Sequence, residues 1–123
     1  MKILVIDDEV YIREGLKQVL QMEGYEVQVA ADGKEAIALI QKDIPDIIIT
    51  DIIMPEKDGV EVICNVKEKY PDIKIIAISG GGRISAHDYL KIAKQLGANT
   101  ILTKPFSSND LIMEIQKLCG TNK

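Results

Sequence analysis

Three short apolar runs, rich in β-branched residues, alternate with segments in which apolar residues recur at helical spacing. The runs are residues 2–6, 47–50 and 73–78, and each has about the length of a buried strand. After the first run, Ile12, Leu16 and Leu20 lie on one face of a predicted helix, and Gly24 is typical of its end. A chain in which strands and helices alternate in this way forms a mostly parallel sheet with helices on both faces.

Two further segments complete the predicted sheet and constrain its order. Tyr25, Val27 and Val29 alternate with polar residues, as expected of a half-exposed strand, and residues 100–103 form a short last strand. The three continuous runs are expected to be buried on both faces and therefore central. With right-handed crossovers, the favoured strand order is 2-1-3-4-5. The predicted fold class is α/β: a single doubly wound (βα)5 domain of the flavodoxin-like type.

Side chains suited to capping precede three of the predicted helices. These are Asp32, the pair Ser85 and Asp88, and the pair Ser107 and Asp110. Each pair has the spacing of a capping box, in which two side chains bond reciprocally to backbone N–H groups. The helices are therefore expected to begin close to these residues.

Three carboxylates follow two of the predicted central strands. Asp7 and Asp8 leave the first strand, and Asp51 leaves the third. In the predicted order the chain reverses direction between these strands, and open α/β sheets bind ligands at the carboxyl ends of the strands beside that point. Crowded like charges are costly unless a cation neutralises them. Mg²⁺ commonly uses one or two carboxylates with waters and a phosphate, so the three acids predict a divalent cation site.

Two other strand ends supply different chemistry. Ser79 follows the fourth strand, and its hydroxyl can donate to an anionic oxygen. Lys104 follows the fifth strand and brings a positive charge. Taken singly, an acidic pair is often a solvated helix start, and a lone Lys-Pro or Ser says little. Together, the strand ends supply what transfer of a phosphoryl group to a carboxylate requires: a nucleophile, a metal site and cationic groups for the phosphoryl oxygens.

The same residues resemble the receiver domain of two-component response regulators, the CheY-like family. The resemblance rests on Asp7-Asp8, on the stretch DIIMPEKDG beginning at Asp51, on Ser79 and on Lys104-Pro105-Phe106, and it spans nearly the whole chain. It implies a receiver domain over residues 1–119. A short tail at 120–123 then leaves no output domain in this chain, which is expected to be either a stand-alone receiver or a fragment of a longer protein. It also implies a signalling domain and not an enzyme, apart from self-catalysed phosphotransfer and autodephosphorylation.

The resemblance assigns the phosphoacceptor and the metal ligands. Asp51 would take the phosphoryl group from a phosphohistidine on a sensor histidine kinase or a histidine phosphotransfer protein. Asp8 and Asp51 would ligate Mg²⁺ directly, and Asp7 would contribute through water. The backbone carbonyl of Ile53 would complete the protein ligands.

The resemblance also assigns the residues that respond to phosphorylation. Lys104 would contact the phosphoryl group, and Ser79 would move toward it, shifting the loop after strand 4 and the face formed by helix 4, strand 5 and helix 5. An unknown downstream target protein would read that face. The family carries a switching aromatic three residues before the lysine, where this chain has Ile101. Coupling between Ser79 and this face is therefore expected to use other residues.

The composition disfavours several other classes. A net charge of −4 disfavours binding to nucleic acid and to anionic membrane surfaces. No apolar segment has the length of a signal peptide or a membrane span, so a cytoplasmic location is predicted. Cys64 and Cys119 are not spaced as a zinc or disulfide motif, and they are predicted to be buried reduced thiols.

Two functions of other classes share part of this pattern. A Mg²⁺-dependent phosphohydrolase with an aspartate nucleophile typically has the pattern D-x-D-x-T after its first strand. This chain has Asp7-Asp8-Glu9-Val10 at that place. A cofactor carrier of the flavodoxin shape would need a phosphate loop rich in Ser, Thr and Gly, and an acidic loop would repel the flavin phosphate. An absorbance spectrum of the purified protein separates the carrier from the receiver.

Overall fold

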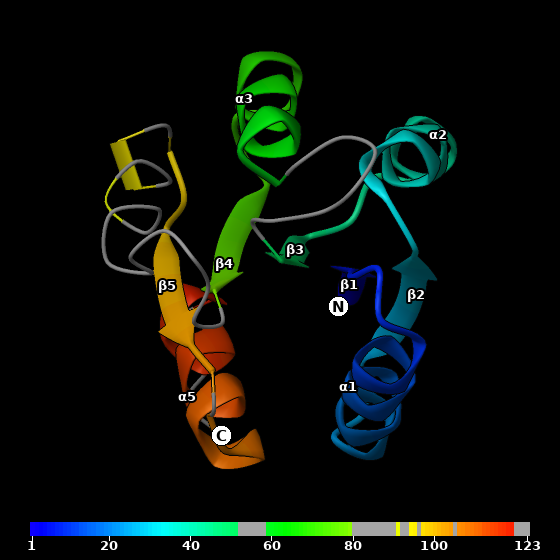
Figure 1. Ribbon diagram of the computed structural model, residues 1–123, viewed down its shortest axis with the longest axis vertical. Coiled ribbons are helices and arrows are strands. Elements are labelled where there is room, and N and C mark those ends of the chain that lie inside the picture. Colours follow the sequence, from blue (N-terminus) through cyan, green and yellow to red (C-terminus); the bar gives the residue numbers. More distant parts are fainter. Residues whose placement is uncertain (52–58, 80–90, 92–93, 96, 105, 120–123) are drawn as a thin grey trace.

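Five parallel strands form one sheet in the order β2-β1-β3-β4-β5 in the computed structural model of the chain (Figure 1). The structure describes residues 1–51, 59–79, 91, 94–95, 97–104 and 106–119. The strands are β1 (Lys2–Ile6), β2 (Glu26–Ala30), β3 (Ile47–Asp51), β4 (Lys74–Ser79) and β5 (Thr100–Thr103). The helices in these ranges are α1 (Val10–Met22), α2 (Gly33–Lys42), α3 (Gly59–Lys69) and α5 (Ser108–Cys119). The predicted fold class and strand order are confirmed.

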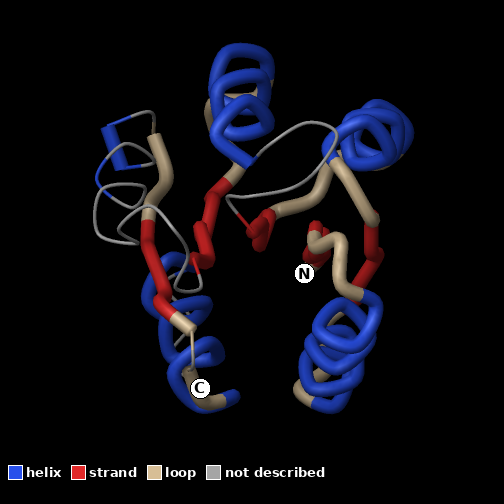
Figure 2. The backbone as a smooth tube through the Cα atoms, viewed as in Figure 1, coloured by secondary structure: helices blue, strands red, loops and turns tan. Residues whose placement is uncertain are grey.

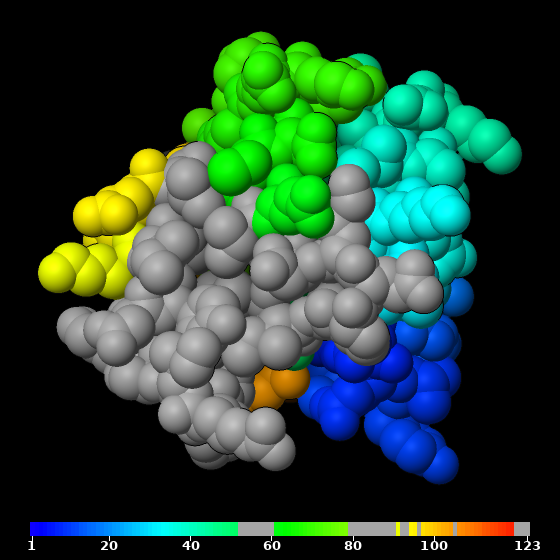
Figure 3. Space-filling model, turned by 45° about the horizontal axis from the view of Figure 1, so that its top comes forward, coloured from blue at the N-terminus to red at the C-terminus, as the bar shows by residue number. Residues whose placement is uncertain are grey.

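The sheet is a layer between two pairs of helices within the described ranges, with α1 and α5 on one face and α2 and α3 on the other (Figures 1 and 2). Side chains alternate across the sheet, so Leu4 and Ile6 of β1 pack with α2 and α3, whereas Ile3 and Val5 pack with α1 and α5. The surfaces of α2 and α3 adjoin in Figure 3. None of the helices in these ranges is long and apolar enough to cross a lipid bilayer.

Burial follows the predicted ranking of the strands. Every residue of β3 is buried, and β1 is buried from Ile3 onward. In β2, by contrast, exposed residues alternate with half-buried Val27 and Val29, as expected of an edge strand. Each fully buried isoleucine contributes about 1.5–3 kcal/mol through removal of its apolar surface from water. The central strands therefore hold the ends of β1 and β3 in fixed positions.

Two of the three predicted helix caps lie in the described part of the chain, and both are present. At the start of α2, Asp32 Oδ1 accepts from the backbone N–H of Glu35 at 2.8 Å. Before α5, Ser107 Oγ accepts from the backbone N–H of Asp110 at 3.0 Å, and Asp110 Oδ2 accepts from the N–H of Ser107 at 3.2 Å. The third cap, predicted at residues 85–88, lies outside the described residues.

The prediction that both cysteines are buried is wrong. Cys64 and Cys119 are free and exposed. On α3 the positions that face the core belong to Val62, Ile63 and Val66, so Cys64 is left on the outward side of the helix. Their unpaired state agrees with the absence of a disulfide or zinc spacing in the sequence.

Candidate functional site

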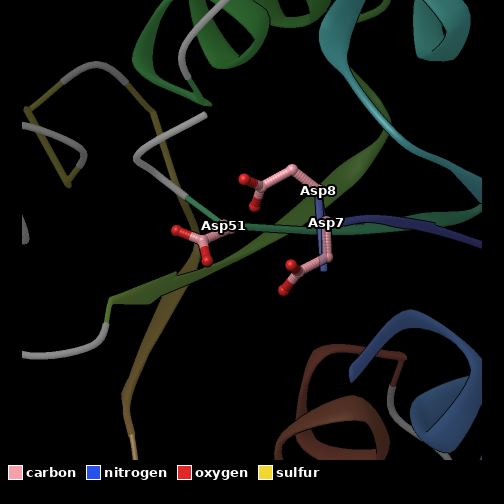
Figure 4. A group of neighbouring side chains, drawn as sticks. All are labelled: Asp7, Asp8 and Asp51. Atoms are coloured by element: carbon pink, nitrogen blue, oxygen red, sulfur yellow. The ribbon is translucent and has the colours of Figure 1, made fainter. Parts of the chain in front are cut away.

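Three carboxylates meet at the carboxyl ends of β1 and β3, which are adjacent parallel strands. Asp7 and Asp8 follow β1, and Asp51 is the last residue of β3. One carboxylate oxygen from each of the three residues lies within 4.8 Å of the other two. Figure 4 shows the three side chains extending beyond the ends of the two strands. The structure thus brings together the acids that were predicted to meet at this edge of the sheet.

The three acids differ in their exposure to solvent. The side chain of Asp8 is exposed, whereas Asp51 is 9% exposed and Asp7 only 1%. Asp7 Oδ1 accepts from the backbone N–H of Glu9 at 2.9 Å. Its other oxygen, Oδ2, is buried and accepts no hydrogen bond from the described residues. A buried carboxylate oxygen without such a partner is costly, and a cation beside it would offset that cost.

The Lys104 ammonium supplies positive charge at this edge of the sheet. Lys104 follows β5, and its Nζ donates to Asp51 Oδ2 at 3.1 Å. The same Nζ lies 3.8 Å from Asp7 Oδ2, which is an ion pair without a hydrogen bond. The lysine therefore approaches two of the three acids and is closest to Asp51.

Burial and neighbouring charges alter the protonation of the site. Burial raises the pKa of Asp7 to about 6, and the charges of Asp51 and Asp8 add to this rise, while the Glu9 N–H and Lys104 oppose it. Burial by itself lowers the pKa of Lys104, but the carboxylates around it outweigh burial, and the net shift is upward. With all four groups ionised, three carboxylates face one ammonium, and the site keeps an excess of negative charge.

The donor set of this acidic cluster fits a hard divalent cation. The three residues that could hold an ion, Asp7, Asp8 and Asp51, all offer carboxylate oxygens. Mg²⁺ and Ca²⁺ prefer oxygen ligands, whereas zinc sites usually contain His or Cys. Asp7 Oδ2, which accepts no hydrogen bond from the described residues, and the excess negative charge both favour a cation at this position.

Of two further predicted site residues, the structure describes the backbone of Ser79 but not Ile53. The backbone of Ser79 ends β4, which lies between β3 and β5, so Ser79 stands at the same edge of the sheet as Asp51 and Lys104. Ile53, predicted to offer its backbone carbonyl to the metal, lies outside the described residues. Most of the DIIMPEKDG stretch lies outside them as well.

Arg13 contacts the site, although no sequence pattern pointed to it. Its Nη1 donates to the backbone carbonyl of Asp7 at 2.8 Å. Because every residue has a backbone carbonyl, the sequence does not show which residue accepts such a bond. The only sequence signal is an arginine early in the helix that follows the acidic pair, which is too common to be diagnostic.

Comparison with known protein families identifies a match over most of the chain. The sequence model of the response regulator receiver domain family matches residues 3–116 of this chain. The probable transcriptional regulator ycf27 of Cyanophora paradoxa is 41% identical over 117 residues, which cover 95% of this chain and 47% of that protein. The chain spans about half the length of the first curated relatives that it matches.

Solved receiver domains share the fold. The receiver domain of NtrX from Brucella abortus has a TM-score of 0.89 at 31% identity, over 98% of this chain and 99% of that one. The chemotaxis protein CheY4 of Vibrio cholerae has a TM-score of 0.86 at 34% identity, over 95% of this chain and 97% of that one. Similarity in sequence and similarity in structure to receiver domains thus both extend over nearly all of the chain. It belongs to the response regulator receiver domain family, whose general role is to accept a phosphoryl group.

Proposed function

We propose that this chain accepts a phosphoryl group on Asp51 in a Mg²⁺-dependent reaction and acts as a two-component signalling domain. The observation that carries the proposal is the position of Asp51, which lies beside two other carboxylates and accepts from Lys104 Nζ at 3.1 Å. This is a carboxylate nucleophile with a cation on one side and a metal-binding group of acids on the other. The general role of the family supports the assignment.

In the proposed reaction, one carboxylate oxygen of Asp51 attacks phosphorus while the P–N bond of a phosphohistidine breaks, and its electron pair leaves with the imidazole. Lys104 Nζ then pairs with a phosphoryl oxygen. Asp8 and Asp51 would hold Mg²⁺, with Asp7 contributing through water and the backbone carbonyl of Ile53 completing the set. When bound, Mg²⁺ supplies positive charge that offsets the charge of the phosphoryl oxygens.

The proposed partners follow from this chemistry. The phosphohistidine belongs to a sensor histidine kinase or a histidine phosphotransfer protein, and a separate target protein reads the phosphorylated form. The only reactions of the domain itself are phosphotransfer to Asp51 and loss of that phosphoryl group to water. The net charge of −4 argues against nucleic-acid binding by this domain. As in the family generally, the place of action is the cytoplasm.

Replacing Asp8 with alanine tests the metal requirement. The change removes one oxygen ligand, so we expect Mg²⁺ to bind at least about tenfold more weakly, since even partners outside the ligand shell change affinity by about 10–100-fold. The rate of phosphorylation by acetyl phosphate, followed by mass spectrometry, should shift to higher Mg²⁺ concentrations by the same factor. Glu14→Ala removes the same charge from an exposed position on α1 and should leave the rate unchanged. Equal Mg²⁺ dependence in Asp8→Ala and the parent would contradict the proposed site.

We propose that phosphorylation acts mainly through the segment after β4. Ile101, at the position of the family's switching aromatic, lies in β5, is half-buried and packs against the core between the sheet and the helices α2 and α3. It has no ring that could change between exposed and buried positions. Ser79 is the remaining link, because its hydroxyl can donate to a phosphoryl oxygen on Asp51. The face formed by β5, α5 and the helix predicted to begin near Ser85 would then respond through the backbone after Ser79.

Amide hydrogen exchange with and without beryllofluoride, a mimic of the phosphoryl group, tests this route. Protection should rise at residues 80–84, which lie outside the described residues, and should change little around Ile101. Glycine loses more conformational entropy on folding than any other residue, so the sequence of three glycines at 80–82 predicts low local stability, and switching motions are commonly drawn from segments of low stability. A change confined to β5 would show that the switch lies elsewhere.

A further inference from the structure

Asp7 is held in place by three hydrogen bonds. Its backbone N–H donates to the carbonyl of Ala30 at 3.1 Å, and its Oδ1 accepts from the N–H of Glu9 at 2.9 Å. Its backbone carbonyl accepts from Arg13 Nη1 at 2.8 Å. The fourth polar group, Oδ2, accepts no hydrogen bond within the described part of the chain and lies 3.8 Å from Lys104 Nζ. The three bonds together fix the orientation of this remaining oxygen.

Arg13 provides its bond where the pairing of β1 ends. The register of β1 with both neighbouring strands stops at Ile6, so the Asp7 carbonyl lies beyond the paired strands. Asp7 is buried, and a buried carbonyl that no donor reaches costs free energy. The Arg13 guanidinium meets this need with a charged donor, which makes stronger hydrogen bonds than a neutral one.

The same residue ties the site to helix α1. The N-cap residue of α1, Glu9, makes no side-chain capping bond. The backbone N–H of Arg13 donates to the Glu9 carbonyl at 3.0 Å, while its side chain reaches back to Asp7. Arg13 thus contacts both ends of the turn that runs from Asp7 to Glu9. Because these contacts start from a helix packed on the sheet, they restrict how far the turn can move.

From this geometry we infer that Arg13 is a positioning residue for the proposed metal site, an inference that rests on the proposed function. A guanidinium has no lone pair to offer a cation, so Arg13 is not a ligand. It acts through the Asp7 backbone, by holding the turn that presents the carboxylates of Asp7 and Asp8 to Asp51. Groups that orient metal ligands in this way change metal affinity by about 10–100-fold when they are removed.

Arg13→Met tests the inference, because methionine keeps a long apolar stem but has neither a charge nor a donor. Isothermal titration of the chain with Mg²⁺ should give a dissociation constant about tenfold higher than that of the parent. Lys17→Met is the matched control: it makes the same change of charge about one turn further along α1, at a half-buried residue that makes no bond to the Asp7–Glu9 turn in the described part of the chain. It should bind Mg²⁺ within about twofold of the parent, since it leaves the bonds between Arg13 and the Asp7–Glu9 turn intact.

Two further measurements separate positioning from a general loss of stability. Arg13→Lys keeps a charged donor without the planar fork, and it should recover part of the lost Mg²⁺ affinity. In metal-free Arg13→Met, the Glu9 amide should exchange about tenfold faster than in the parent, because its acceptor on Asp7 is less well held. The amide of Ile76, in the centre of the sheet, should be unchanged. Faster exchange at both amides would indicate general destabilisation and would overturn the inference.

The outcome also distinguishes this inference from the proposed function. A parent chain that binds no Mg²⁺ would overturn the proposed metal site. A parent that binds Mg²⁺ with an affinity that Arg13→Met leaves unchanged would overturn the role of Arg13 alone.

Discussion

Asp51→Asn is expected to abolish phosphorylation of the chain. Asparagine keeps the shape of the side chain and an oxygen that can accept from Lys104 Nζ, which lies 3.1 Å from Asp51 Oδ2. The amide, however, lacks the carboxylate oxygen that would form the bond to phosphorus in the proposed reaction. After incubation with acetyl phosphate and Mg²⁺, mass spectrometry should find one added phosphoryl group on the parent and none on the variant. The loss in rate should be at least about a thousandfold, the scale seen when an enzyme loses its nucleophile.

The matched control is Asp46→Asn. It makes the same substitution just before the amino-terminal end of β3, whereas Asp51 lies at the carboxyl-terminal end of that strand. Asp46 is exposed, and its Oδ2 accepts from the backbone N–H of Lys2 at 2.9 Å. This variant should be phosphorylated at the rate of the parent. Labelling of Asp51→Asn to the level of the parent would show that another residue is the acceptor.

The fold could be predicted because burial leaves a direct mark on the composition of a strand. The residues of β3 are buried at every position, and the first four form an uninterrupted β-branched run, whereas β2 alternates in sequence as it alternates in exposure. The helix starts at Asp32 and Ser107 were also predictable, because a capping bond is local. The exposure of Cys64 could not be predicted, because the average burial of cysteine does not say which face of a helix it occupies.

The site could be predicted only as far as the strand ends determine it. Asp7 and Asp8 are adjacent and chemically identical, yet Asp7 is 1% exposed and Asp8 is exposed. The difference arises because the Asp7 N–H still bonds to the Ala30 carbonyl of β2, which keeps Asp7 in the layer of the sheet. The contact from Arg13 to the Asp7 carbonyl could not be predicted from the sequence either, since it depends on where α1 lies relative to the end of β1.

Asp7→Asn is expected to change how the stability of the metal-free chain depends on pH. Burial raises the pKa of Asp7 to about 6 in the folded chain, against an ordinary value of 3.8. Between these values the folded state binds more protons than the unfolded state, so the free energy of unfolding of the parent falls as pH rises through this window. The full fall is about 3 kcal/mol at most, because each pH unit of difference corresponds to about 1.4 kcal/mol. Asparagine carries no proton to lose and removes this fall.

Urea unfolding in EDTA at several values between about pH 4 and about pH 7 measures the effect. The free energy of unfolding of Asp7→Asn minus that of the parent should increase by about 2–3 kcal/mol across the range. The asparagine amide will also face Lys104, whose Nζ lies 3.8 Å from Asp7 Oδ2, but this cost is constant while the lysine stays charged and does not alter the slope. Mg²⁺ at a hundred times its dissociation constant should stabilise the parent by about 2.7 kcal/mol and the variant by less. A difference that stays constant with pH would show that ionised Asp7 is not penalised in the folded chain, and the case for a cation beside its buried oxygen would lose its energetic basis.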